Sequence, residues 1–325
     1  MLQVSELHKK AGERLEAASG NPKKIALLHT AIALGVSFLL TVVNYLFSLG
    51  IAGTGGLDGL GARSILATAQ TMLELAVAVG LPIWQLGIFY TALKWAKSET
   101  VTRTDLLHCF RRLGSVLGML LLRMLLFFGL GLAVIYISTA VFMMTPWAEP
   151  LLEVYKPFMD QNLTQAQLEA LLTPELIATI TQAALPLFIL CGVLYLVVAI
   201  PVYYRVRFAE FAVMEGETAA RALIRSFTIT RKNCMQVFKI DLSFWWFYVL
   251  QALSVALCYL DVALPLVGIQ LPIPTVVSAL VFFLLGCICQ TLLLWQYEAH
   301  RVTVYALAYR KLSGADEEDN TLLEG

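Results

Sequence analysis

Charged side chains are scarce in this chain, at 14% of its 325 residues, whereas hydrophobic residues make up 59%. A soluble domain needs a polar surface, so this balance excludes an ordinary water-soluble protein. The mean hydropathy of +0.75 indicates that lipid is the solvent for most of the chain.

Signatures of catalytic, metal and nucleotide sites are also missing. The four histidines have no ligand spacing; they are His8, His29, His108 and His300. Among the six cysteines, Cys287 and Cys289 are two residues apart, which points them to different sides of a helix. The sequence therefore predicts no metal, no cofactor, no disulfide framework and no enzyme.

Six apolar stretches are each long enough to cross a bilayer, whose hydrocarbon core takes about 20 helical residues. They cover residues 25–49, 65–93, 113–143, 176–203, 242–264 and 275–295. Lipid cannot satisfy backbone hydrogen bonds, and the alternating polarity of a β-barrel is absent, so we expect six helices. We predict an all-α polytopic membrane helix bundle in one domain, 1–312, with an acidic disordered tail, 313–325.

The positive charges indicate how the chain is threaded. All but three of the 23 lysines and arginines lie before the first span or in alternate connections after it. The exceptions are Arg63, Arg123 and Lys156. Because short basic connections stay in the cytoplasm, both termini are predicted to be cytoplasmic, in a multi-pass protein of the bacterial cell (plasma) membrane.

The basic inner face has two interpretations. Correct insertion and attraction to anionic lipids explain it most simply, at about 1 kcal/mol per Lys or Arg near the surface. A specific anionic ligand or nucleic acid is the alternative; we expect no nucleic-acid partner. The candidate contacts to anionic lipids are Arg111, Arg112, Arg221, Arg225, Arg231 and Lys232.

Short amphipathic stretches precede three of the spans, at residues 4–18, 106–110 and 220–227. Their apolar residues recur three and four positions apart with charges between, as in Ala220, Leu223, Ile224 and Phe227. Such a stripe is typical of helices that lie in the membrane surface, here the cytoplasmic one.

Two ionisable residues lie inside predicted spans, where a lone charge costs at least about 2.5 to 3.5 kcal/mol. Glu74 and Arg123 both come near the membrane midplane, on successive spans. Our functional hypothesis is that this intramembrane pair lines a polar path or ligand pocket, although we favour the structural alternative. The alternative is a structural ion pair that sets helix register, or an Arg123 that snorkels while Glu74 stays protonated.

Further polar side chains within the spans are expected to form hydrogen bonds between helices rather than substrate contacts. They are Asn44, Gln70, Gln85, Gln182, Gln251 and Gln290.

Three segments resemble a bacterial membrane family. The first is Gly87-Ile88-Phe89-Tyr90 through Glu99, with Asp105-Leu106 and Phe110. The second is Glu215, Ala219-Ala220, Ser226, Lys232-Asn233, Phe238-Lys239, Asp241-Leu242-Ser243-Phe244 and Trp246. The third is Tyr297–Leu312, with Tyr305 and Tyr309. Together they cover about half the chain and resemble the integral membrane proteins called domain of unknown function 975 (DUF975).

The resemblance implies a six-span membrane protein without an assigned reaction, distantly similar to the membrane domain attached to some glycerophosphodiester phosphodiesterases. It brings no catalytic residues. We favour a non-enzymatic factor in envelope assembly, secretion or stress tolerance, acting in the lipid bilayer through a membrane protein partner. A transporter or channel with a polar path near Glu74 and Arg123 is the alternative. A lipid-modifying enzyme is third, because nucleophile, base and metal signatures are missing.

Overall fold

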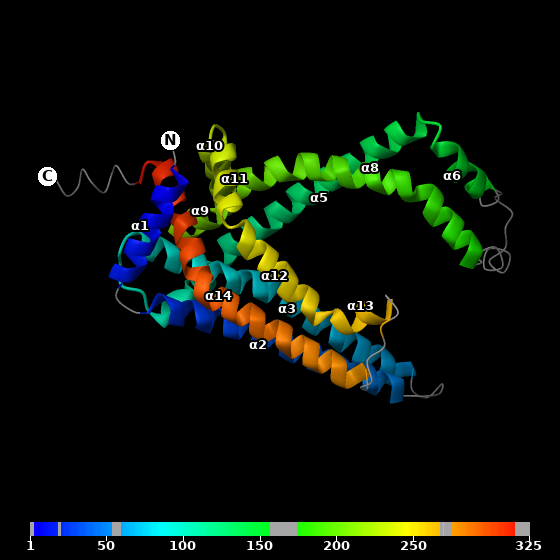
Figure 1. Cartoon of the computed structure of the whole chain (residues 1–325), viewed down its shortest axis with the longest axis horizontal. Coiled ribbons are helices and arrows are strands. Elements are labelled where there is room, and N and C mark those ends of the chain that lie inside the picture. Colours follow the sequence, from blue (N-terminus) through cyan, green and yellow to red (C-terminus); the bar gives the residue numbers. More distant parts are fainter. Residues whose placement is uncertain are drawn as a thin grey trace. The chain divides into compact units, whose positions relative to one another are not determined.

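The computed structural model describes residues 3–18, 21–53, 60–156, 174–266, 269 and 275–315. These residues form helices and no strand, which confirms the all-α prediction (Figure 1). Among them, five helices are long and apolar enough to cross a membrane, or up to six if one bent pair counts as a span. Their length and composition fit a multi-pass membrane protein.

Two compact units divide the chain. The first unit comprises Met1–Met119 and Arg207–Gly325, and the second comprises Leu120–Val206. The single domain predicted over 1–312 includes residues of both units, and it stays a prediction. The acidic residues of the predicted tail, from 316 onward, lie outside the described residues.

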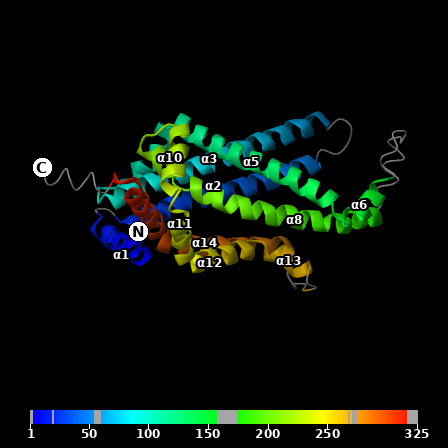
Figure 2. The same cartoon turned by 90° about the horizontal axis from the view of Figure 1, so that it is seen from above.

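Long helices form the body of the first unit. They are α2 (Pro22–Gly53), α3 (Leu60–Ala96), α12 (Trp245–Cys258) and α14 (Thr275–Ser313). Helix α14 packs against the other three, and it lies beside α12 in both views (Figures 1 and 2). More than half of the side chain surface is exposed at Leu39, Leu46 and Leu75. An apolar exterior of this kind suits contact with lipid.

The predicted fifth span, 242–264, is not one straight helix. The chain forms α11 (Cys234–Ser243), α12 and α13 (Leu260–Leu266), and α11 is bent by 59° from α12. The breaks fall at Phe244 and Tyr259, whose backbone angles lie near φ −105° and ψ 15°, outside the helical region. The first break turns α11 toward α1 (Val4–Ala17), which it contacts.

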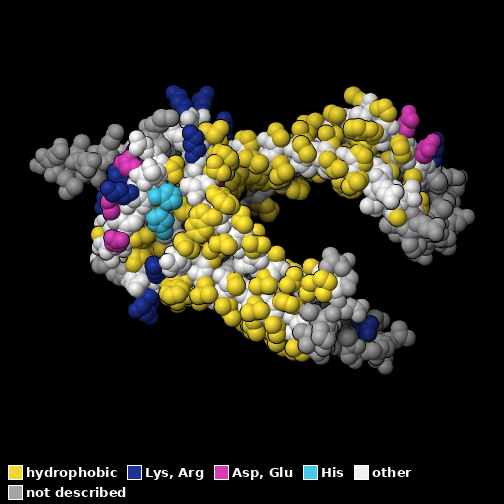
Figure 3. All heavy atoms as spheres, viewed as in Figure 1, with side chains coloured by type: hydrophobic (Ala, Val, Ile, Leu, Met, Phe, Trp, Pro, Cys, Tyr) yellow, Lys and Arg dark blue, Asp and Glu magenta, His cyan; other side chains and the backbone are white. Residues whose placement is uncertain are grey.

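One end of the first unit is a polar head, which we define by α1, α11, the C-terminal third of α14 and four short helices. Those four are η2 (Arg103–Leu107), α4 (His108–Arg111), α9 (Ala209–Glu215) and α10 (Ala219–Thr230). Charged and histidine side chains gather over α1 and the end of α14, where the apolar surface of the spans stops (Figure 3).

Helix α14 continues well past residue 295, where its predicted span ends. From Val302 to Arg310 every residue is buried, so this part of the helix forms the core of the head. Tyr248 and Tyr305 both donate hydrogen bonds to Asp241 of α11, which ties that helix to α12 and α14. The head is thus packed like the interior of a soluble domain.

The predicted amphipathic helices are present, but α10 does not bury its apolar stripe as α1 does. Helix α1 buries Leu7 and Ala11 from its apolar stripe. Helix α10 instead buries the small residues Ala222, Ser226 and Thr230, and Ile224 of its apolar stripe is 66% exposed. An exposed stripe fits a helix in the membrane surface, and that location stays a prediction.

The second unit contains α5 (Leu113–Met143) from Leu120 onward, α6 (Ala148–Tyr155) and α8 (Pro174–Val206). Helix α6 packs against α8. Large apolar side chains are widely exposed on both long helices, as Phe128 and Phe188 illustrate. These surfaces again suit lipid rather than water.

Candidate functional site

A cavity of about 340 Å³ lies among α2, α3, α12 and α14 in the first unit. Its polar lining residues are His29, Thr30, Ser37, Gln85, Gln251, Gln290, Glu298 and Arg301. Because four helices of a predicted membrane bundle contribute these groups, the cavity is the candidate functional site.

The lining residues of each helix lie on one face of that helix, because they recur with helical spacing. On α14, Gln290, Leu294 and Glu298 recur every four residues, so they share one face of the helix. His29, Ala33 and Ser37 repeat the same spacing on α2. The site is therefore built on regular helices rather than on loops, which holds its side chains in a defined arrangement.

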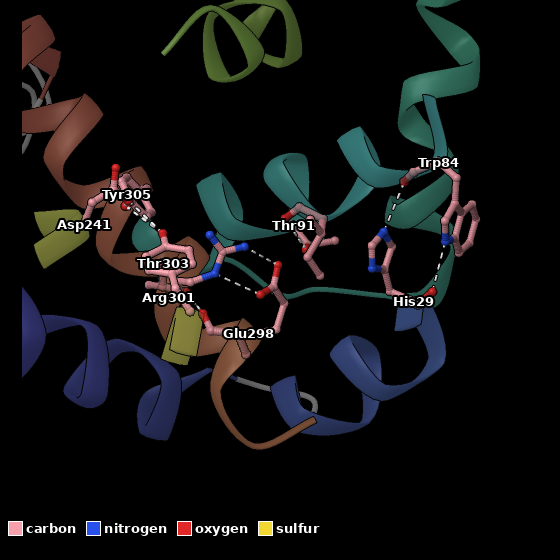
Figure 4. A network of polar contacts seen from close by, with 11 residues as sticks. His29, Trp84, Thr91, Asp241, Glu298, Arg301, Thr303 and Tyr305 are labelled. Atoms are coloured by element: carbon pink, nitrogen blue, oxygen red, sulfur yellow. Dashed lines mark hydrogen bonds and ion pairs between the residues drawn. The ribbon is translucent and has the colours of Figure 1, made fainter. Parts of the chain in front are cut away.

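The fixed charges of the cavity are Glu298 and Arg301, which form an ion pair (Figure 4). Arg301 donates from Nη2 and Nε to the two carboxylate oxygens of Glu298, at 2.8 and 3.0 Å. The guanidinium also lies over the ring of Phe247, 5.3 Å from its centroid. Two paired charges can be retained in a site of low polarity, whereas either one alone would be costly.

His29 fastens α2 to α3 at the wall of the cavity. The indole nitrogen of Trp84 donates to the backbone oxygen of His29, at 3.0 Å, and His29 Nε2 lies 3.2 Å from the Trp84 oxygen (Figure 4). The two rings are stacked with centroids 5.4 Å apart. Because the Trp84 backbone oxygen can only accept, Nε2 carries a hydrogen, which sets the tautomer of the neutral ring.

Three glutamines differ from the sequence expectation. The side-chain amides of Gln85, Gln251 and Gln290 make no hydrogen bond to any other described residue, so the bonds expected between helices are not formed there. Each amide offers donors and an acceptor to the cavity. Free hydrogen-bonding groups beside an ion pair are the kind of lining that binds a polar molecule.

Glu74 lies in a second polar cluster of the first unit. It accepts hydrogen bonds from Asn44 of α2, at 3.0 Å, and from Gln70 of its own helix, at 3.1 Å. The expected bond between helices is therefore formed at Asn44, whose buried side-chain oxygen is left without a partner. Asn44 is seven residues beyond Ser37, so both lie on the same face of α2.

Arg123 belongs to the second unit, where its guanidinium lies over the ring of Tyr203 of the same unit, 5.8 Å from the centroid. The structure thus gives Glu74 and Arg123 separate partners within their own units. Their joint role in a polar path stays a prediction.

The predicted contacts to anionic lipids fall into two groups. Arg111, Arg221, Arg231 and Lys232 are exposed on the head. Arg112 and Arg225 are half-buried and line a second, separate cavity within the head. Sequence patterns alone did not distinguish the two groups.

The sequence interpretation missed Glu298, Arg301 and His29 as site residues. Its predicted span ended at residue 295, although the spacing of Gln290, Leu294 and Glu298 continues the same helical face. Among the described residues, no three His, Cys, Asp or Glu side chains are grouped so that they could hold a metal ion. Comparisons with family models, curated proteins and solved structures found no match to this chain.

Proposed function

We propose that the protein is a multi-pass transporter or channel whose solute site is the polar cavity among α2, α3, α12 and α14. The supporting observation is a set of unbonded amides beside a largely buried ion pair, inside a bundle of apolar helices. In this proposal the polar head faces the cytoplasm of a bacterial cell, as the distribution of Lys and Arg favours. The cavity then opens in the inner half of the membrane.

The charges of the site suggest the class of solute. An ion of one sign would bind one member of the Glu298–Arg301 pair and leave the other uncompensated. A small zwitterion can satisfy both, with its carboxylate near Arg301 and its ammonium near Glu298. The cavity of about 340 Å³ accommodates a molecule of amino-acid size. We therefore propose small neutral amino acids as the first solutes to test.

A role in envelope assembly through a membrane protein partner stays a prediction, as does membership of the DUF975 family. The cavity favours solute binding over a purely structural role, because unpaired polar groups are costly to keep among apolar helices.

Uptake into proteoliposomes tests the proposal. Purified full-length protein should take up radiolabelled glycine, alanine or serine in a saturable manner, inhibited by excess unlabelled solute. Gln290→Leu removes one unbonded amide without disturbing the ion pair, and it should raise KM at least about tenfold. The matched control is Gln182→Leu, an exposed glutamine of α8 outside the cavity. Uptake no greater than in protein-free liposomes for all three solutes would overturn the proposal.

A further inference from the structure

The head contains a larger cavity, of about 770 Å³, at the junction of α3, α4, α9 and α10. Its charged lining residues are Lys94, Lys97, Glu99, Arg112, Glu215, Glu217 and Arg225. His108 and Tyr90 add a pair of stacked rings, whose centroids are 3.7 Å apart. This cavity shares no lining residue with the proposed solute site.

Most of these charges are already paired. Lys94 donates to both carboxylate oxygens of Asp105, at 3.1 Å each. Arg225 forms an ion pair with Glu217, at 3.2 Å, and lies 3.8 Å from Glu215. Glu215 also accepts a hydrogen bond from Tyr309 at 2.7 Å. These groups are held in position and have little capacity left for a ligand.

Arg112 and Lys97 are different, because neither side chain has an ion pair or hydrogen bond with another described residue. The Arg112 guanidinium lies against Gly216, whose φ is +121°. A Cβ at position 216 would come within 3.1 Å of that guanidinium, so glycine allows both the turn and the close approach. Glu99 also lines the cavity without such a partner. Together with Asp105, Glu215 and Glu217 it balances the four cations Lys94, Lys97, Arg112 and Arg225, so the site is neutral overall and Arg112 is its half-buried cation without an ion pair to a described residue.

The pKa of His108 reflects burial and the positive charges of the neighbouring arginines. Burial lowers the pKa of His108, and the positive charges of Arg112 and Arg111 lower it further. A half-buried guanidinium that forms no ion pair is a strong hydrogen-bond donor to an oxyanion.

We infer that this cavity binds a phosphate-bearing anion, with Arg112 as the bidentate group and Lys97 as the second positive charge. Phosphate suits the site better than a single carboxylate, because it can engage the planar guanidinium and the ammonium at once. The volume also exceeds what one small oxyanion requires, so the ligand should carry an organic group beyond its phosphate. The phosphate could belong to a lipid headgroup or to a soluble phosphate ester; both present the same chemistry.

Calorimetric titration of the full-length protein in detergent tests this inference. The two probes are dioctanoyl phosphatidic acid, which carries a lipid phosphate, and glycerol 3-phosphate, which is soluble. Wild-type protein should bind at least one of them saturably. Arg112→Gln should weaken that binding at least about tenfold, and Lys97→Gln by less, since an exposed ammonium interacts more weakly.

The matched control is Arg111→Gln, which removes an exposed arginine at the neighbouring position, outside the cavity lining. Binding of the lipid probe alone assigns the site to a headgroup, and binding of both probes assigns it to phosphate esters in general. The inference is overturned if neither probe binds saturably, or if Arg111→Gln weakens binding as much as Arg112→Gln does. Amino-acid uptake is measured separately, so either idea can fail without the other.

Discussion

One histidine of the N-terminal helix α1 contacts both α14 and α11. His8 Nδ1 lies 3.0 Å from Nε2 of His300, and His8 Nε2 lies 2.9 Å from the hydroxyl of Ser243. One imidazole must accept a hydrogen bond from the other, so the contact requires at least one neutral ring. Burial lowers the pKa of His8, which favours the neutral form in the folded protein.

Acidification should therefore loosen the docking of α1. The pKa of histidine in an unfolded chain is about 6.5, and the pKa of His8 in the folded protein is lower. As the pH falls, the unfolded state therefore binds the proton first. The contact contributes fully to stability above the pKa of the unfolded chain. This contribution is lost as the pH falls through the lower pKa of His8 in the folded protein. Thermal unfolding between pH 8 and pH 5 should show a smaller fall in Tm for His8→Gln than for the wild type. Equal falls would contradict this prediction.

At the scale of elements, glycine allows α3 to approach η2. A Cβ at Gly87 would overlap the backbone oxygen of Leu106, which cannot move away as a flexible side chain could. Leu106 itself is fully buried against this contact.

Gly87→Ala should lower the free energy of unfolding by about 1–3 kcal/mol, because the added methyl group overpacks a backbone contact. The control is Gly80→Ala on the same helix, where a Cβ would meet nothing within 4 Å. Alanine should be neutral or stabilising there, by up to about 1 kcal/mol, because it favours a helix. Thermal unfolding in detergent compares the two variants, and a Gly80→Ala protein as unstable as Gly87→Ala would refute the explanation.

For the whole molecule, the distribution of charge predicts the orientation in the membrane. Thr218, between α9 and α10, belongs to the basic head, whereas Lys156 follows α6 beside the acidic residues Glu149 and Glu153. An alkaline phosphatase reporter, which is active only outside the cytoplasm, should therefore be active when fused after Lys156 and inactive after Thr218. The reverse pattern would invert the topology and move the proposed phosphate site to the outer face.

The amino-acid sequence by itself determined the helical class, the positions of the apolar helices and the segregation of basic residues. These properties follow from local rules, because lipid demands internal hydrogen bonds and a run of apolar side chains from each segment separately. The same rules placed Glu74 near the centre of one span and Asn44 within another. The structure shows that the two side chains are hydrogen-bonded.

Only the tertiary structure decided which polar groups meet. His29, Gln251 and Glu298 come from three helices far apart in the chain, and no local pattern relates them. The structure also separated the half-buried Arg112 from the exposed Arg111, although the two are adjacent in sequence. Packing selects one rotational setting of each helix against its neighbours, and that choice depends on side chains from other segments.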